Sequence, residues 1–404
     1  MSKNLRTNLV QEFVCLADSC ADTCCKHWSM QVDDVTIAKY QQAAEWGNAE
    51  LMSAVEMDGS GSYIMQKNPT TGCCVKFADG KCQIQSQYGE EFLGDACALY
   101  PRITRKLDGF TIVTATMSCP EIARIALYGN QPFDFVEVAA ISRVPQEIKN
   151  VLPAEVSPQE ALTIHADFLA ATEDEKAHAE QIFARIASAA RSLQFIKPSD
   201  WVNATPVYLR LADGRLPISG NNAPEKNIND PFNLLHALCG LVVASKKPAP
   251  PRLQQTISDM ETALHVVLDW QNALIKTGDD SLAASNALQA LWESELRETY
   301  NPPLKKWLKA QLSAAFFPFA GLGDNITERI TIIGFRLAIL RLAILSTYSI
   351  QKNKHGKMLP DDEFVRIAQS LSRFLDHLAS PLFLLQICTE TGWDKEARMR
   401  GILI

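Results

Sequence analysis

The sequence predicts a mainly α protein in which a cysteine-rich N-terminal metal-binding region with little sheet precedes a multi-helix body. Three observations lead to this fold class. Nine of the eleven cysteines fall before residue 120, apolar residues recur at helical spacing from Pro158 onward, and strand-like alternation is confined to one short segment. With 404 residues and 47% hydrophobic content, the chain is long enough for more than one core. We expect a cysteine-rich region over residues 1–130 and a helical body over residues 131–404.

Within residues 1–130, the pattern predicts loops, short helices and one strand. Residues 33–46 have the apolar spacing of a short helix. Thr and Val alternate over residues 110–117, which is typical of a strand. The segments 130–132 and 145–158 contain prolines and are predicted to connect this region to the helical body.

Eight helices are predicted in the body from apolar periodicity, over residues 158–171, 173–192, 230–245, 253–276, 281–300, 302–316, 325–351 and 360–378. Ser157, Asp230 and Asn301 are favoured capping residues, and each precedes a proline whose missing N–H is not needed in a first helical turn. Two proline-rich stretches, 196–230 and 246–251, interrupt the helices. The first is either a substrate-facing loop or an ordinary surface excursion.

The most apolar stretch, residues 330–350, approaches the length that spans a bilayer. Arg336 and Arg341 lie in its middle, where a membrane would make them costly. Its repeated Arg-Leu-Ala-Ile-Leu pattern spreads apolar side chains around most of a helix. We therefore expect a buried core helix and no membrane insertion.

Charge and the first residues narrow the class of function. A formal net charge of −7 and a pI near 5.6 offer no basic face for nucleic acid or anionic lipid, so no nucleic-acid partner is expected. Residues 1–12 are polar and contain no apolar stretch of signal-peptide length. We expect a cytoplasmic protein.

The clustered cysteines indicate a metal centre rather than disulfides, because a reducing cytoplasm disfavours structural disulfides. Four thiolates suit either zinc or a [4Fe–4S] cluster, and the spacing does not separate the two. The paired CxxC motifs common in zinc proteins are absent. A CxxxCxxC triplet, which serves radical chemistry on S-adenosylmethionine, is also absent, since His27 follows Cys24 at the required position.

The expected inner ligand set comes from three separate blocks of sequence and would tie the region together: Cys20, Cys24, Cys82 and Cys97. Further candidates are Cys15, Cys25, Cys74 and Cys119. Up to half of the nine N-terminal thiols have packing as the alternative role, because free cysteine behaves as a small hydrophobe. Cys239 and Cys388 lie in apolar runs and are expected in the core.

Four N-terminal blocks carry a resemblance to a known family. The blocks are Phe13-Val-Cys15 with Cys20-Ala-Asp-Thr-Cys24-Cys25-Lys-His-Trp28, Cys74-Val-Lys-Phe with Asp79-Gly-Lys-Cys82-Gln-Ile84, Leu93 with Cys97-Ala-Leu-Tyr100-Pro-Arg102, and Ser118-Cys119-Pro-Glu121. The chain resembles the flagellin lysine N-methyltransferase family, or lysine-N-methylases, within a wider cysteine-cluster group described as zinc- or iron-chelating. The second block departs from the family pattern Cys-Pro-Phe-Leu and carries an extra Cys73.

The resemblance implies transfer of a methyl group from S-adenosylmethionine to surface lysines of flagellin, and a [4Fe–4S] cluster held by some of the cysteines. Our reading is that the cluster is structural, supplying folding free energy to a loop-rich region. The glycine-rich turn of the common doubly wound methyltransferases is absent from the sequence. The alternatives are a non-enzymatic metal-binding or metal-delivery protein that docks a partner through its helical body, and an electron-transfer protein.

Lysine methylation requires a neutral amine, so a group in the site must accept a proton. Candidates beside the cysteine blocks are Asp95, Tyr100, Arg102 and Glu121, with Trp28 as a stacking surface and His27 as a weaker candidate. The alternative role for these residues is to orient metal ligands through hydrogen bonds.

Overall fold

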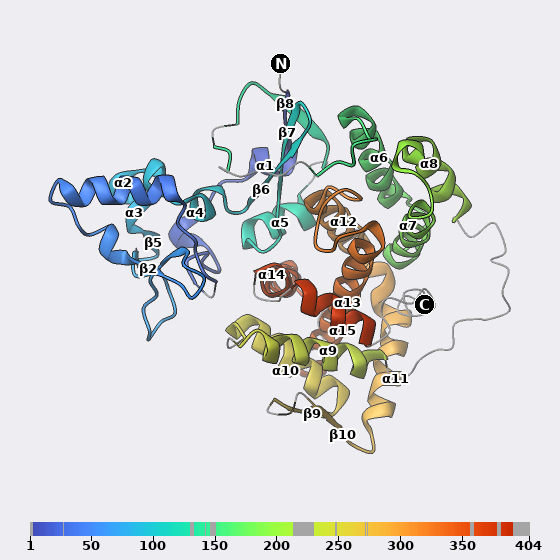
Figure 1. Ribbon diagram of the computed structural model, residues 1–404. Coiled ribbons are helices and arrows are strands. Elements are labelled where there is room, and N and C mark those ends of the chain that lie inside the picture. Colours follow the sequence, from blue (N-terminus) through green and yellow to red (C-terminus); the bar gives the residue numbers. More distant parts are fainter. Residues whose placement is uncertain are drawn as a thin grey trace.

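The computed structural model describes residues 3–26, 28–129, 133–141, 143–145, 151–212, 230–246, 249–270, 272, 274–355, 359–377 and 381–390. These residues are mainly helical, with one four-stranded sheet and three two-stranded ribbons (Figure 1). The mainly α class predicted from the sequence is confirmed.

The four-stranded sheet joins the N-terminus to a hairpin between the third and fourth cysteine blocks and to a strand after the fourth. Its strands are β1 (Lys3–Thr7), β6 (Arg102–Leu107), β7 (Phe110–Ala115) and β8 (Phe135–Val138), in the order β6-β7-β1-β8. β1 is parallel to β7 and antiparallel to β8, while β6 and β7 form a hairpin. The strand predicted at 110–117 is β7. The other three were not predicted, because charged and polar residues interrupt the apolar alternation of β1 and β6.

The helical body is arranged around its two longest helices, α12 (Arg297–Ala315) and α13 (Ile326–His355). Its helices are α6 (Pro158–Ala170), α7 (Ala179–Leu193), α8 (Trp201–Leu211), α9 (Asp230–Ala244), α10 (Pro251–Leu264), α11 (Ser281–Leu291), α12 (Arg297–Ala315), α13 (Ile326–His355), α14 (Asp361–His377) and α15 (Pro381–Glu390). The predicted start of α6 is confirmed in detail: Ser157 and Glu160 form a reciprocal capping box. α8 lies inside the stretch predicted to be irregular, whose residues 213–229 fall outside the described chain.

The predicted helix start at Asn301 is wrong. α12 continues through Pro302 and Pro303, after a π-helical turn at Trp292–Leu296. Tyr300 is buried in this segment and stacks on Phe364 at a centroid distance of 5.5 Å, so tertiary packing holds the helix despite the lost N–H donors. The side chain of Asn301 caps a different helix.

Asn301 Oδ1 accepts a hydrogen bond of 2.9 Å from the backbone N–H of Ala179, the first residue of α7. The start of α7 predicted at residue 173 is therefore six residues early. Residues Ala171–Glu173 instead form a short 3₁₀ turn.

The helix predicted over residues 253–276 is also wrong in its second half. α10 ends at Leu264 because His265 adopts the left-handed conformation, at φ +54°. The chain then forms a hairpin of β9 (Val266–Asp269) and β10 (Leu274–Thr277). The β-branched pair Val266 and Val267 favours this strand over another helical turn.

α13 is the buried core helix that the sequence predicts. Its apolar segment Ile326–Lys352 is long and apolar enough to cross a membrane, but residues 330–348 of it are all buried within the protein. Both arginines have partners: Arg336 lies 2.6 Å from Asp376, and the guanidinium of Arg341 lies 4.7 Å from the ring centroid of Trp292. The middle of the helix is thus enclosed by protein.

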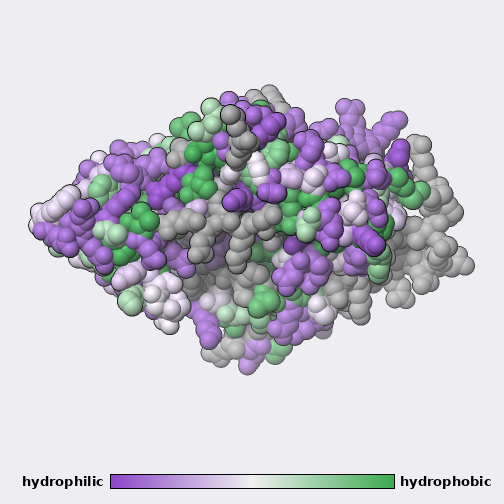
Figure 2. All heavy atoms as spheres, turned by 45° about the horizontal axis from the view of Figure 1, so that its top comes forward, coloured by the Kyte–Doolittle hydropathy of each residue, from purple (hydrophilic) through white to green (hydrophobic). Residues whose placement is uncertain are grey.

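The first three cysteine blocks build a separate small core, whereas Cys119 of the fourth block packs with the helical body. Its elements are α2 (Asp34–Glu45), the ribbon of β2 (Val55–Met57) and β3 (Tyr63–Met65), the ribbon of β4 (Phe77–Ala78) and β5 (Lys81–Cys82), α3 (Gln83–Tyr88) and α4 (Asp95–Leu99). They extend away from the helical body (Figure 1). The outer surface of this unit is mostly hydrophilic (Figure 2). Buried Met30, Ile37, Tyr40 and Leu51 lie at its centre.

The larger core combines the sheet, α1 (Asn8–Glu12), α5 (Pro120–Tyr128) and the helical body. The N-terminal strand and residues after Arg102 therefore pack with the helices rather than with the cysteine blocks. The domain division at residue 130 stays a prediction. The two hydrophobic cores divide the chain at other residues: the smaller core contains residues 30–98, and the larger core contains the residues before and after them. Cys239 and Cys388 are buried in the larger core, as predicted.

Candidate functional site

A cavity of about 940 Å³ lies where the cysteine-rich unit meets the sheet and the helical body. Its walls come from the loop after the first cysteine block, from β6, and from the ends of α12 and α14. Small-molecule sites usually have volumes of about 300–1,000 Å³, so this cavity is large enough for a nucleoside-sized ligand together with a side chain.

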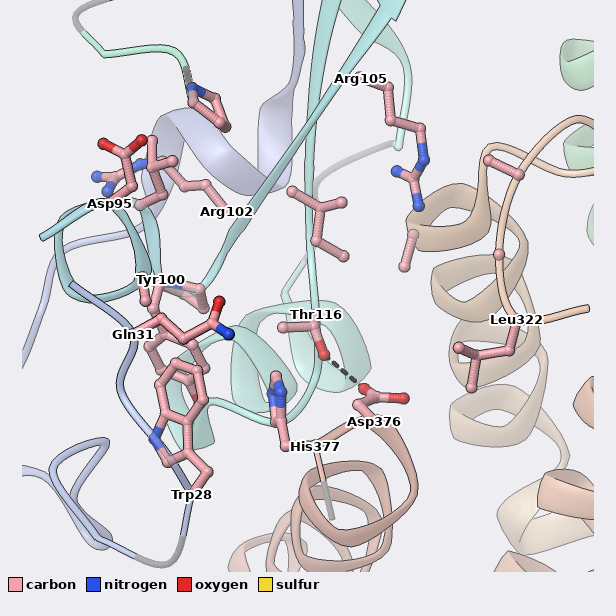
Figure 3. A pocket seen from close by; sticks show the side chains of 18 of the residues that line it. Trp28, Gln31, Asp95, Tyr100, Arg102, Arg105, Thr116, Leu322, Asp376 and His377 are labelled. Carbon is pink, nitrogen blue, oxygen red and sulfur yellow. Dashed lines mark hydrogen bonds between the residues drawn. The ribbon is translucent and has the colours of Figure 1, made fainter. Parts of the chain in front are cut away.

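Three aromatic rings form one side of the cavity, here called the aromatic cage: Trp28, Tyr100 and His377 (Figure 3). Ring centroids are 5.5 Å apart for Trp28 and Tyr100, 5.0 Å for Trp28 and His377, and 6.0 Å for Tyr100 and His377. Rings at such distances are in direct contact with one another. The ring faces that line the cavity can still attract a cation, including an ammonium group. The cage is therefore suited to a lysine side chain or to a sulfonium.

Hydrogen bonds behind the cage hold two of its rings. The hydroxyl of Ser118 lies 3.2 Å from the Tyr100 hydroxyl and 2.9 Å from Nε2 of His377. The hydroxyl of Thr116 is 3.2 Å from Ser118 and donates a bond of 2.7 Å to Asp376. Ser118 is fully buried, so this network is shielded from bulk water.

The two polar rings of the cage have different protonation states. Burial lowers the pKa of His377 below its ordinary value, although Asp376 opposes the shift. Burial also raises the pKa of Tyr100 well above 10. At neutral pH, His377 is a neutral imidazole that accepts a proton, whereas Tyr100 keeps its proton and serves as a hydrogen-bonding group.

Arginines line much of the remaining wall: Arg102, Arg105, Arg329 and Arg336. Arg336 is paired with Asp376, and Arg102 lies over the ring of Phe13 at 5.5 Å. Arg329 donates to three backbone carbonyl oxygens, those of Pro318, Gly323 and Asp324, at 2.7–3.1 Å. Arg105 has only a bond of 3.2 Å to the hydroxyl of Thr114 among its hydrogen bonds to described residues.

The cysteines lie in two neighbouring groups. Cys24, Cys25, Cys74, Cys82 and Cys97 influence one another electrostatically: burial and then the nearby Cys24, Cys82 and Cys74 raise the pKa of Cys97. In the second group, burial and then Cys20 and Cys15 raise the pKa of Cys119 to about 12. All these thiols are free, without disulfides.

In the described part of the chain, no three His, Cys, Asp or Glu side chains converge closely enough to hold a single metal ion. A zinc ion would need sulfurs about 2.3 Å from one centre. An iron–sulfur cluster is larger, and its four thiolates bind at different corners. The thiols of the first group are suitable ligands for such a cluster. Their arrangement does not define which of them would bind which iron.

Helix α14 connects the first cysteine loop to the cage. Arg373 forms an ion pair of 2.6 Å with Asp22 and donates to the carbonyl oxygens of Thr23 and Lys26 at 2.6 and 2.7 Å. One turn later, the same helix supplies Asp376 and His377. The loop also carries Trp28, whose indole N–H donates to the carbonyl oxygen of Cys24 at 2.6 Å.

The residues proposed from the sequence divide by position. Trp28, Asp95, Tyr100 and Arg102 line the cavity. Asp95 is held by an ion pair of 2.8 Å with Arg143, which suggests a positioning role for its carboxylate. Glu121 lies elsewhere, on α5, where it pairs with Arg124 at 2.6 Å. His27 falls outside the described residues.

Sequence reasoning missed His377, Asp376, Arg105 and the two buried hydroxyls. Ser118 stands in the fourth cysteine block, so its position offered a signal. His377 ends a predicted amphipathic helix, where a basic residue is expected for helix stability alone. Only the fold brings it within 3 Å of Ser118, across 259 residues of sequence.

Comparison with known proteins gives partial, distant matches. The "Flagellar biosynthetic protein FliU" of Salmonella muenchen is 23% identical over 133 residues, which cover 28% of this chain and 70% of that protein. The "Lysine-N-methylase" of Salmonella typhimurium is 23% identical over 133 residues, 28% of this chain and 29% of that protein. No family model and no solved structure matches the chain. The chain is thus similar, over somewhat more than a quarter of its length, to a flagellar biosynthetic protein and to lysine-N-methylases.

Proposed function

We propose that the protein is an S-adenosylmethionine-dependent protein-lysine N-methyltransferase whose substrate is flagellin. The observation that carries the proposal is the aromatic cage, in which a neutral His377 lies beside Trp28 and Tyr100 at the edge of a nucleoside-sized cavity. The partial similarity to lysine-N-methylases supports the same reaction. Flagellin is made in the cytoplasm before export, and we place the protein there.

The residues around the cage suit the proton and charge changes of methyl transfer. A lysine ammonium lies against the ring faces that line the cavity, and its proton passes to His377, either directly or through the hydroxyl of Ser118. The free amine then forms a bond to the methyl carbon of the donor. The carbon–sulfur bond breaks, and its electron pair stays on sulfur as the neutral thioether. The positive charge lost from the sulfonium remains within the aromatic cage, on the methylated amine and His377.

The cysteines are proposed to hold a [4Fe–4S] cluster, with zinc as the alternative. Of the predicted inner set, Cys24, Cys82 and Cys97 lie in one group, and Cys25 or Cys74 is the nearest source of a fourth thiolate. Cys20 lies with Cys15 and Cys119 in the second group. The cluster would act as a crosslink in a unit that has few long helices or strands.

The test is methyl transfer from S-adenosylmethionine labelled in its methyl group to purified flagellin from the same organism. The anaerobically purified chain is expected to label flagellin lysines, located by peptide mass spectrometry. Flagellin with acetylated lysines is the matched control and should stay unlabelled. Absence of both donor binding and transfer by an iron-loaded protein would overturn the proposal and favour a metal-binding module that docks a partner.

A further inference from the structure

Arg105 is a charged group in the cavity wall with no anionic partner among the described residues. Its Nη1 donates to the Thr114 hydroxyl at 3.2 Å, and no described carboxylate lies within 4 Å of its guanidinium. Arg329 and Arg336 line the same cavity, but backbone carbonyl oxygens satisfy the first and Asp376 neutralises the second. Of these three arginines, Arg105 alone has neither a carboxylate partner nor a set of carbonyl acceptors among the described residues.

Burying the charge of Arg105 without an anionic ligand decreases the stability of the fold. Burial, and then the nearby charge of Arg329, lower the pKa of Arg105 to about 10. Arg105 nevertheless stays charged at neutral pH, because that pKa lies well above 7. A partly buried guanidinium next to another cation is destabilising unless an anion completes the site. A carboxylate fits best, since its two oxygens match the forked N–H groups of arginine.

The position of Arg105 gives the cavity two chemically different sides. Figure 3 shows Arg105 on β6, opposite Trp28, Tyr100 and His377, with Thr116 between the two sides. Apolar Ile332 and Ile333 of α13 and Leu322 complete the wall. A ligand that carries a carboxylate would therefore be oriented by Arg105, with its remaining groups directed along the cavity toward the cage.

We propose that Arg105 is the subsite for the carboxylate of the amino-acid portion of S-adenosylmethionine. This assignment rests on the proposed function. It orients the donor between Arg105 and the aromatic cage, so that the methyl group faces the lysine amine held there. Arg329 acts behind Arg105 as a positioning residue, because its guanidinium is held by backbone oxygens and cannot turn toward the ligand without losing them.

The test compares two ligands that differ only in the carboxylate: S-adenosylmethionine and its decarboxylated analogue. Binding is measured by titration calorimetry on the metal-loaded wild type and on Arg105→Met. We expect the variant to bind S-adenosylmethionine about tenfold or more weakly, in line with a lost charged hydrogen bond. The analogue should bind wild type and variant equally. Lys106→Met, on the exposed face of the same strand, is the matched control and should bind both ligands as the wild type does.

The outcomes separate the subsite from the proposed function. Failure of the wild type to bind either ligand would overturn the methyltransferase proposal. Wild-type binding with equal losses for both ligands in Arg105→Met, or with no loss for either, would overturn the carboxylate subsite alone. If Arg105→Met does not fold, as judged by its thermal transition, Arg105→Lys replaces it. That variant keeps the charge, loses the fork, and should show the same ligand-selective loss at smaller size.

Discussion

At the residue scale, His377 is the group whose environment most resembles that of a general base. Asp376 precedes it on α14, Arg373 and Arg336 also face it, and burial outweighs the opposing carboxylate in lowering its pKa. A base must be neutral to accept a proton, so activity requires a pH above the pKa of His377. That pKa lies below the ordinary value of about 6.5.

We therefore expect methyl transfer to fall as the pH decreases through a value below 6.5, with no loss between pH 7 and 8 from this residue. His377→Gln should lower kcat by about 10²–10⁴-fold while the Kd of the donor changes little. Steady-state rates and donor titration at several pH values measure both effects. Ser118→Ala is the companion variant. An acid limb that persists unchanged in a residually active His377→Gln would contradict the role.

Trp28 is expected to contribute binding rather than chemistry. Its ring supplies the largest aromatic face of the cage, and cation–π attraction contributes about 0.5–2 kcal/mol. Trp28→Leu should raise the KM for flagellin lysine by roughly 2–30-fold with a smaller change in kcat. Trp28→Phe should recover part of the loss. Trp46, which is 78% exposed on the cysteine-rich unit, offers the control Trp46→Leu, and this change should leave KM unaltered.

A second buried histidine allows a stability prediction. Nδ1–H of His165 donates a hydrogen bond of 2.8 Å to the carbonyl oxygen of Phe317, and burial lowers the pKa of His165 to about 4. The unfolded chain binds a proton below pH 6.5, while the folded chain does not until about pH 4. The free energy of unfolding should therefore decrease by about 3 kcal/mol between pH 6.5 and pH 4 from this residue.

Denaturant unfolding at pH 7 and pH 4.5 measures that decrease. His165→Gln should show a smaller decrease than the wild type, because glutamine does not titrate. The exposed His265 is the control: it pairs with Asp280, and His265→Gln should keep the wild-type acid dependence attributed to His165. An identical pH dependence in wild type and His165→Gln would contradict the assignment.

Part of the site was predictable residue by residue. Trp28, Tyr100 and Arg102 stand in the cysteine blocks, so local sequence singled them out, and all three line the cavity. His377 and Arg105 carry no local signal. Their importance depends on long-range contacts, as when α14 brings His377 to Ser118, and no spacing rule along the chain reports such a contact.

At the element scale, α14 links the first cysteine loop to the aromatic cage of the cavity. Arg373 is almost fully buried, and its guanidinium is shared among Asp22 and two carbonyl oxygens of the loop. Removing one partner of a buried ion pair costs about 3–5 kcal/mol. Arg373→Met is thus expected to release the loop and displace Trp28 from the cage.

The expected result for Arg373→Met is a joint loss of iron retention and of donor affinity. Metal analysis and calorimetry measure the two properties. Arg366→Met is the control on the same helix, because Arg366 pairs with Glu363 within α14, although it also bonds to Arg252 and Thr256 of α10. Full iron retention with unchanged donor affinity in a folded Arg373→Met protein would show that the contacts of Arg373 with the cysteine loop have no functional role.

Elements that are stabilised by local contacts were predicted more accurately than elements that depend on contacts with distant parts of the chain. Helices whose starts are set by local capping, such as α6 at Ser157, were predicted within a residue. α12 was divided wrongly at Asn301, because its continuity depends on the packing of Tyr300 against Phe364. β1 was missed since its pairing partners lie more than 100 residues away in β7 and β8.

At the scale of the whole molecule, two hydrophobic cores of very different size meet at the cavity. The larger one spans the sheet and the helical body, whereas the smaller one holds the cysteine-rich unit together with short helices and ribbons of two or three residues. Small units of this kind usually need a crosslink or a metal to remain folded. The cavity takes one wall from each part, so binding of the proposed methyl donor is expected to depend on both.

Removal of the metal should therefore loosen the cysteine-rich unit selectively. Hydrogen exchange followed by mass spectrometry, before and after chelation, is expected to show lost protection in α2 and α4 but not in α13. Cys82→Ser should reproduce the chelated pattern and lower the iron content. Cys239→Ser is the matched control in the larger core and should retain both iron and protection. If chelation leaves α2 and α4 as protected as before, the centre does not stabilise this unit. In that case hydrophobic packing around Tyr40 alone is sufficient to hold its wall of the cavity in place.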